Sequence, residues 1–166
     1  MTLRCPGLAA LALAGVAAGA TGCPSAYQRT YDRETQRLET QQKVETEQER
    51  AAHAEAQKYA AVAYFDVGSA ELRPRDQGEL DWFVKQMEPF PKALIEVNGF
   101  ADSTGAEATN QQLSKDRAEA VENYLESKGI ESSRIVTQSF STQFPAASNE
   151  NSAGRRNNRR VEVTVR

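Results

Sequence analysis

The sequence predicts an α/β protein with one mixed four-stranded sheet and two main helices, in the order β-α-β-α-β-β, preceded by a helical tether. After about residue 61, short apolar stretches alternate with longer amphipathic ones, as strands alternate with helices. Residues 161–165 alternate apolar and polar side chains, which is typical of a half-buried strand. Residues 24–60 contain no glycine and are rich in Gln, Glu, Arg and Ala, which favour a helix.

The elements of the globular part follow one another without an internal repeat. Residues 61–65 (AVAYF) predict a short buried strand, and Pro74 is placed to open a helix. The apolar face of that helix has side chains at i, i+3, i+4 and i+7, namely Leu80, Phe83, Val84 and Met87. Further strands are predicted at 93–100 and 134–140, on either side of a long helix at about 106–128.

The first residues have the features of a secretory signal peptide. Arg4 precedes an uncharged apolar run at residues 8–20, which is too short to span a bilayer as a helix. The segment Ala-Thr-Gly-Cys that ends at Cys23 resembles the lipobox of bacterial lipoproteins. The resemblance implies removal of residues 1–22 and lipid on Cys23, which would anchor the chain to a membrane. An ordinary signal peptide followed by a chance cysteine is the less favoured alternative.

Residues 23–60 predict a lipidated N-terminus followed by a polar tether. Opposite charges recur at helical spacing, whereas apolar side chains are sparse. Tyr27, Tyr31 and Leu38 form a thin stripe that no sustained heptad continues. We therefore expect a solvated helix or a partly disordered segment in preference to a specific dimer. His53, the only histidine, is expected to be a solvated surface residue.

The composition argues against several classes of function. The net charge of -3 gives no reason to expect a nucleic-acid partner. The arginines at 155, 156, 159 and 160 are better explained as a solvated or salt-bridged face than as a nucleic-acid patch. One histidine, and no cysteine after Cys23, leave no set for a catalytic triad or a metal cluster. We expect no enzyme activity, no catalytic residues, no cofactor and no metal.

Arg117 falls in the middle of the core-facing stripe of the long helix. Leu113 and Val121 lie about 80° apart around the helix axis, with Arg117 between them. A charge at that position is costly unless it is paired, and the best local partner is Asp102, in the polar loop 102–105. Loops at the carboxyl ends of strands are where α/β sheets bind ligands. The spacing alone supports equally a site for a zwitterionic ligand and a salt bridge that only ties the helix to the sheet.

Four motifs, in order, resemble the OmpA-like peptidoglycan-binding domain. They are YFDVGSAEL at 64–72, NGFADSTG at 98–105, NQQLSKDRA at 110–118 and GRRNNRRVE at 154–162. The resemblance covers about residues 62–166, and it implies an OmpA-like α/β sandwich domain at 61–166. It also implies that Asp102, Arg117 and Asn110 bind the diaminopimelate residue of the cell-wall stem peptide, without covalent chemistry.

The chain departs from the family pattern in three places. Ala101 stands where the family usually has threonine before the loop aspartate. Gly68 stands where some members have asparagine. Residues 139–145 replace a glycine-rich turn after the third strand. These departures bear on affinity more than on the class of ligand.

The resemblance favours a structural tether, as in Pal-type outer-membrane lipoproteins. Its partners would be peptidoglycan and, through lipid on Cys23, the outer membrane on its periplasmic side. Pro24 follows the cysteine in place of the aspartate associated with inner-membrane retention. The alternative is an interaction subunit of an envelope complex, Pal-like or associated with secretion or a motor, in which wall binding is secondary. Alanine at Asp102 or Arg117 is expected to abolish wall binding and leave the fold intact.

Overall fold

The computed structural model describes residues 26–166, so the predicted signal peptide 1–22 and Cys23 lie outside the described residues. The chain divides into two compact units, residues 1–42 and 43–166. The described part of the first unit belongs to helix α1 (Ala26–Ala56). Among residues 26–166, none of the helices combines the length and the apolar character that crossing a membrane requires.

Helix α1 confirms that the segment predicted as a tether is helical over residues 26–56; its role as a tether stays a prediction. Its 31 residues bury only Ala56, at the carboxyl end. The large apolar side chains along it keep half or more of their surface exposed; they are Tyr27, Tyr31, Leu38 and Val44. The helix is therefore polar all round, as the sparse apolar stripe predicted, and its backbone is favoured by the helix propensity of its residues.

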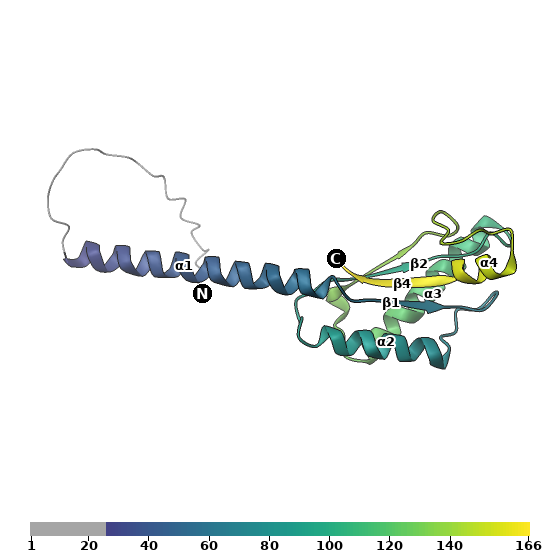
Figure 1. Cartoon of the computed structure of the whole chain (residues 1–166), viewed down its shortest axis with the longest axis horizontal. Coiled ribbons are helices and arrows are strands. Elements are labelled where there is room, and N and C mark those ends of the chain that lie inside the picture. The colour runs from purple at the N-terminus through teal and green to yellow at the C-terminus, as the bar shows by residue number, and fades with distance from the viewer. Residues whose placement is uncertain (1–25) are drawn as a thin grey trace, which may run out of the picture. The chain divides into compact units, whose positions relative to one another are not determined.

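One mixed four-stranded sheet forms the centre of the second unit (Figure 1), with the strand order β1-β4-β2-β3. The strands are β1 (Ala60–Tyr64), β2 (Ile95–Gly99), β3 (Ile135–Ser139) and β4 (Arg160–Val165). Strand β4 pairs antiparallel with both β1 and β2, and β2 pairs parallel with β3. The predicted mixed sheet is confirmed, and each strand lies within two residues of its predicted bounds.

Helices α2 (Pro74–Met87) and α3 (Glu107–Ser127) pack against the sheet through one apolar core (Figure 1). Leu80, Phe83 and Met87 of α2 are buried, as the predicted stripe requires. The α3 side chains in this core are Ala118, Val121 and Leu125, and the strands contribute alternate residues. The result is the predicted two-layer α/β sandwich.

A short helix, α4 (Ser152–Asn158), precedes β4 and was not predicted. It has seven residues and no apolar stripe, so periodicity gives no signal for it. Its start is fixed by a side chain, because the Asn151 carboxamide oxygen accepts a hydrogen bond from the Gly154 amide at 2.7 Å.

Strand β2 and helix α3 approach each other closely at Gly99. A Cβ atom at this position would lie 2.1 Å from the backbone oxygen of Ser114. Only glycine therefore allows α3 to lie at this depth against the sheet. Arg117 follows one turn after Ser114, so the close approach also places the guanidinium at the carboxyl end of β2.

We predict opposite effects for two glycine substitutions. Gly99→Ala forces α3 away from β2 and should lower the free energy of unfolding by about 1–3 kcal/mol, the usual cost of overpacking. Gly78→Ala lies on the exposed side of α2 with no atom within 4 Å, and should raise that free energy by up to about 1 kcal/mol. Urea unfolding measures both, and equal effects of the two changes would contradict the close approach.

Candidate functional site

The three predicted ligand-binding residues come from the loop after β2 and from α3. Asp102 follows β2, Asn110 lies near the start of α3, and Arg117 lies two turns further along. All three are buried, with exposed fractions of 6%, 5% and 0%. The charge of Asp102 acts on the pKa of Arg117, so the structure brings these two side chains within electrostatic range.

Arg117 binds backbone carbonyl groups with its guanidinium. Its Nε donates to the oxygen of Ser69 at 2.9 Å, and its Nη2 donates to the oxygen of Asp66 at 3.0 Å. Nη1 donates to the oxygen of Phe100 at 3.3 Å. The guanidinium carbon also lies 5.5 Å from the centroid of the Phe65 ring, within cation–π range. Arg117 thus ties the segment after β1 to the end of β2.

The predicted ion pair between Asp102 and Arg117 is wrong, because Asp102 pairs with Arg159. Asp102 Oδ2 accepts a hydrogen bond from Arg159 Nη1 at 2.8 Å. Its Oδ1 accepts from the backbone amide of Thr104 at 2.8 Å. Arg159 Nε also donates to the oxygen of Phe65 at 3.0 Å. Sequence reasoning missed Arg159 because it lies 57 residues from Asp102 and is brought near by the pairing of β4 with β2.

The local charges shift both pKa values. Burial lowers the pKa of the Arg117 guanidinium to about 10; the charge of Arg159 lowers it further and that of Asp102 raises it. Arg117 therefore stays charged at neutral pH. Burial raises the pKa of the Asp102 carboxyl, but hydrogen bonds from Arg159 and Thr104 outweigh burial and hold that pKa below its ordinary value. These side chains together hold two cations and one anion at neutral pH.

Asn110 provides an uncommitted amide near these charges. Among residues 26–166, its side chain has no hydrogen-bond partner, although the residue is only 5% exposed. Nearly buried polar groups in proteins are normally paired. The carboxamide is therefore available to a ligand, as donor and acceptor together.

Two departures from the family pattern have a simple backbone explanation. Gly68 has a φ of 67°, the left-handed conformation that asparagine also tolerates, so the turn can keep its shape with either residue. In the segment 139–145, Ser141 has a φ of 48° where the family pattern has a glycine-rich turn. Ser141 still receives the amide of Ala101 on its carbonyl oxygen at 2.8 Å, which holds this loop to the end of β2.

The arginine-rich segment is confirmed as a salt-bridged face at two of its four positions. Arg159 pairs with Asp102, and Arg160 Nε donates to a Glu162 carboxylate oxygen at 2.6 Å. The guanidinium carbon of Arg160 lies 4.0 Å from the centroid of the Phe100 ring. These arginines are structural or belong to the site around Asp102.

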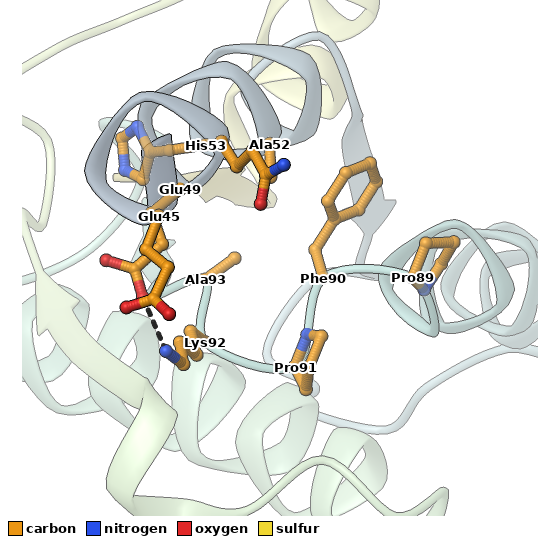
Figure 2. A pocket seen from close by; sticks show the side chains of 10 residues that line it. Glu45, Glu49, Ala52, His53, Pro89, Phe90, Pro91, Lys92 and Ala93 are labelled. Carbon is orange, nitrogen blue, oxygen red and sulfur yellow. Dashed lines mark hydrogen bonds and ion pairs between the residues drawn. The ribbon is translucent and has the colours of Figure 1, made fainter. Parts of the chain in front are cut away.

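A separate hollow of about 510 Å³ lies between the last turns of α1 and the segment 89–93 (Figure 2). Lys92 Nζ and a Glu49 carboxylate oxygen form an ion pair of 2.6 Å across it. His53 is exposed, as predicted, and its Nε2 contacts the backbone oxygen of Arg166. Among residues 26–166, no group of three or more His, Cys, Asp or Glu side chains is placed to hold a metal ion.

A family model adds to this geometry. The model of the OmpA family matches residues 64–159. The chain belongs to the OmpA family.

Among curated relatives, the probable lipoprotein YiaD of Escherichia coli strain K12 is 39% identical over 101 residues, which are 61% of this chain and 46% of YiaD. The peptidoglycan-binding protein ArfA of Mycobacterium tuberculosis H37Rv is 37% identical over 101 residues, 61% of this chain and 31% of ArfA. The chain thus spans 46% of the length of YiaD and 31% of that of ArfA, less than half of either relative.

Solved structures share the fold. The peptidoglycan-associated lipoprotein from Burkholderia pseudomallei superposes with a TM-score of 0.61 and 25% identity, over 64% of this chain and 90% of that one. The cell wall anchor of the T6SS from Pseudomonas aeruginosa superposes with a TM-score of 0.54 and 29% identity, over 61% of this chain and 73% of that one. The predicted OmpA-like fold of this member of the family is confirmed.

We predict that Asp102→Asn lowers the free energy of unfolding at pH 7 by about 1.5–3 kcal/mol, the range for hydrogen bonds to charged groups. The pKa of this carboxyl is lower in the folded chain, so its stabilising effect is complete above the ordinary value of about 3.9 and is lost as pH falls through the folded value. The difference between wild type and variant should therefore shrink below about pH 4.

Urea unfolding from pH 7 to pH 2 measures this difference. Glu88→Gln, at an exposed carboxylate, serves as the control and should show no comparable loss at pH 7. A gap between wild type and Asp102→Asn that stays constant to pH 2 would show that the Asp102 carboxylate is not the titrating partner.

Proposed function

We propose that this chain binds peptidoglycan non-covalently and tethers the outer membrane to the cell wall. The observation that carries the proposal is the buried, ionised carboxylate of Asp102 at the carboxyl end of β2, which is paired with Arg159 and acts on the charge of Arg117. Membership of the OmpA family supports it, since the relative ArfA is a peptidoglycan-binding protein and the Burkholderia structure is of a peptidoglycan-associated lipoprotein.

The ligand that we propose is the diaminopimelate residue of the stem peptide, which carries an ammonium and a carboxylate group. Asp102 accepts hydrogen bonds from the ammonium, and Asn110 adds a donor and an acceptor. Arg117 supplies positive charge for the carboxylate. Arg117 already donates to three carbonyl groups, so the ligand carboxylate would use the second N–H group of Nη1 and of Nη2.

We also propose that lipid on Cys23 anchors the chain in the outer membrane, with the globular part on the periplasmic side. Two of the similar proteins, YiaD and the Burkholderia protein, carry the name lipoprotein, which supports this anchor. The polar helix α1 follows the proposed anchor closely, and its 31 residues extend for about 46 Å at 1.5 Å per residue. A solvated helix of this kind suits a segment between an anchor and a binding domain.

Membership of an envelope complex is the alternative function. The likeness to the cell wall anchor of the T6SS, at 29% identity, favours it. In that case, wall binding positions the chain and a protein partner provides the main role.

We predict that the chain without residues 1–22 pellets with diaminopimelate-type sacculi. Asp102→Asn and Asn110→Ala should each raise the apparent Kd for sacculi at least tenfold, the loss expected for about 1.4 kcal/mol or more of binding free energy. Arg117→Ala is a poor test, because the full burial of Arg117 indicates that this variant loses stability, contrary to the expectation from sequence.

Asn110→Ala is the cleaner variant, since the Asn110 amide has no partner to lose among residues 26–166. Circular dichroism of each variant checks that the fold is retained. If both folded variants pellet as the wild type does, the site is assigned to the wrong residues.

We predict that Cys23→Ser releases the protein from membranes. Two or more acyl chains hold a protein stably, and serine cannot be lipidated by the same thioether chemistry. Fractionation of cells that express either form measures the release. Membrane retention of the serine variant at the wild-type level would rule out the lipid anchor while leaving wall binding untouched.

A further inference from the structure

A cationic hollow lies next to the site around Asp102. Its volume is about 780 Å³, and we call it the arginine hollow. Strand β1, the start of α2 and the α4 region line it, and its lining includes Tyr64, Arg73, Arg75, Arg156, Asn157 and Arg159. Four arginines around one hollow make a strongly positive surface unless carboxylates neutralise them.

Two of these arginines are neutralised and two are not. Arg73 Nε lies 2.6 Å from an Asp76 carboxylate oxygen, and Arg159 is paired with Asp102. Arg75 and Arg156 are exposed, and neither has an ion pair or a hydrogen bond from its side chain to any residue between 26 and 166. The hollow therefore faces solvent with a surplus of positive charge on two uncommitted guanidinium groups.

The start of α2 adds to this positive potential. Arg73 is its N-cap residue and makes no side-chain capping hydrogen bond, and proline occupies the first turn. The positive end of the helix dipole lies at this terminus, where the first-turn carboxylate of Asp76 offsets it in part. A cation such as Arg75 in a first helical turn opposes that dipole and disfavours the helix. Arg75, which lines the hollow without an ion pair to any residue between 26 and 166, is thus available to bind an anion.

Contacts connect the arginine hollow to the proposed wall site. Arg159 lines the hollow and holds the Asp102 carboxylate at 2.8 Å. Arg73 lies 3.7 Å from the Asp66 carboxylate, and the carbonyl oxygen of the same Asp66 accepts from Arg117. The arginine hollow and the site around Asp102 therefore share Arg159.

We propose that the arginine hollow binds a second carboxylate of the wall peptide, held by Arg75 and Arg156, outside the cluster of Asp102, Asn110 and Arg117. This inference rests on the proposed peptidoglycan binding and extends it. Arginine holds carboxylates bidentately, and stem peptides carry more than one carboxylate. A wall peptide whose second carboxylate is a free acid therefore binds more tightly than a peptide in which that carboxylate is amidated.

The test is calorimetric titration of the chain without residues 1–22 with a soluble diaminopimelate muropeptide, as the free acid and with one stem-peptide carboxylate amidated, other than the diaminopimelate carboxylate proposed for Arg117. Arg75→Gln/Arg156→Gln should weaken binding of the free acid by about 5- to 30-fold, the effect of about 1–2 kcal/mol. The same variant should bind the amidated muropeptide as the wild type does. Lys85→Gln/Lys115→Gln removes equal charge from helix surfaces outside the hollow and should stay within about twofold of wild type.

The outcomes separate the two proposals. If Asn110→Ala loses binding but Arg75→Gln/Arg156→Gln matches the lysine control, the arginine hollow is not part of the site and the proposed function stands. If the wild type binds neither muropeptide, both proposals fail. Vesicles of phosphatidylglycerol test whether the hollow binds a membrane surface instead. If Arg75 and Arg156 are needed for binding to the vesicles but have no effect on muropeptide binding, the hollow binds membranes and the inference is overturned.

Discussion

The buried guanidinium of Arg117 is the interaction on which the end of the sheet depends. A cation removed from water costs several kcal/mol unless its donors are satisfied, and here backbone oxygens of Asp66, Ser69 and Phe100 satisfy them. Carbonyl groups from two separate segments converge on one charge, so neither segment can move alone. The loops that border the candidate site are thereby held to α3, a rigid element.

A second set of polar contacts completes this arrangement from the other side. Arg159 neutralises Asp102, and the Asn158 carboxamide bonds both to Ala147 and to the Asn149 side chain. The Asn149 carboxamide oxygen in turn accepts from the amide of Ser103, next to Asp102. Helix α4 and the loop before it therefore do more than connect β3 to β4, because they fix the loop that carries the candidate carboxylate.

The fold was predictable because its signals are local. The helical stripe of Leu80, Phe83 and Met87 and the alternation in 161–165 arise from neighbours in the sequence, and the structure places both as expected. Burial of Arg117 was predictable from its position between apolar residues of one helix face. Its partners were not predictable, because it binds backbone carbonyl groups, which every residue type carries. Arg159 and Asp102 meet through strand pairing, and α4 is set by a single capping asparagine.

The contact between Gly99 and Ser114 has a consequence for how this sequence can change over time. The depth of α3 is set at Gly99, and the reach of the Arg117 guanidinium to the loop carbonyls is set by that depth. A larger residue at 99 would move the helix and disturb the carbonyl contacts of Arg117, so the position of Arg117 depends on the glycine at 99. The chain can accumulate substitutions along α1, where almost nothing is packed, far more freely than at this glycine, which has no side chain and binds nothing.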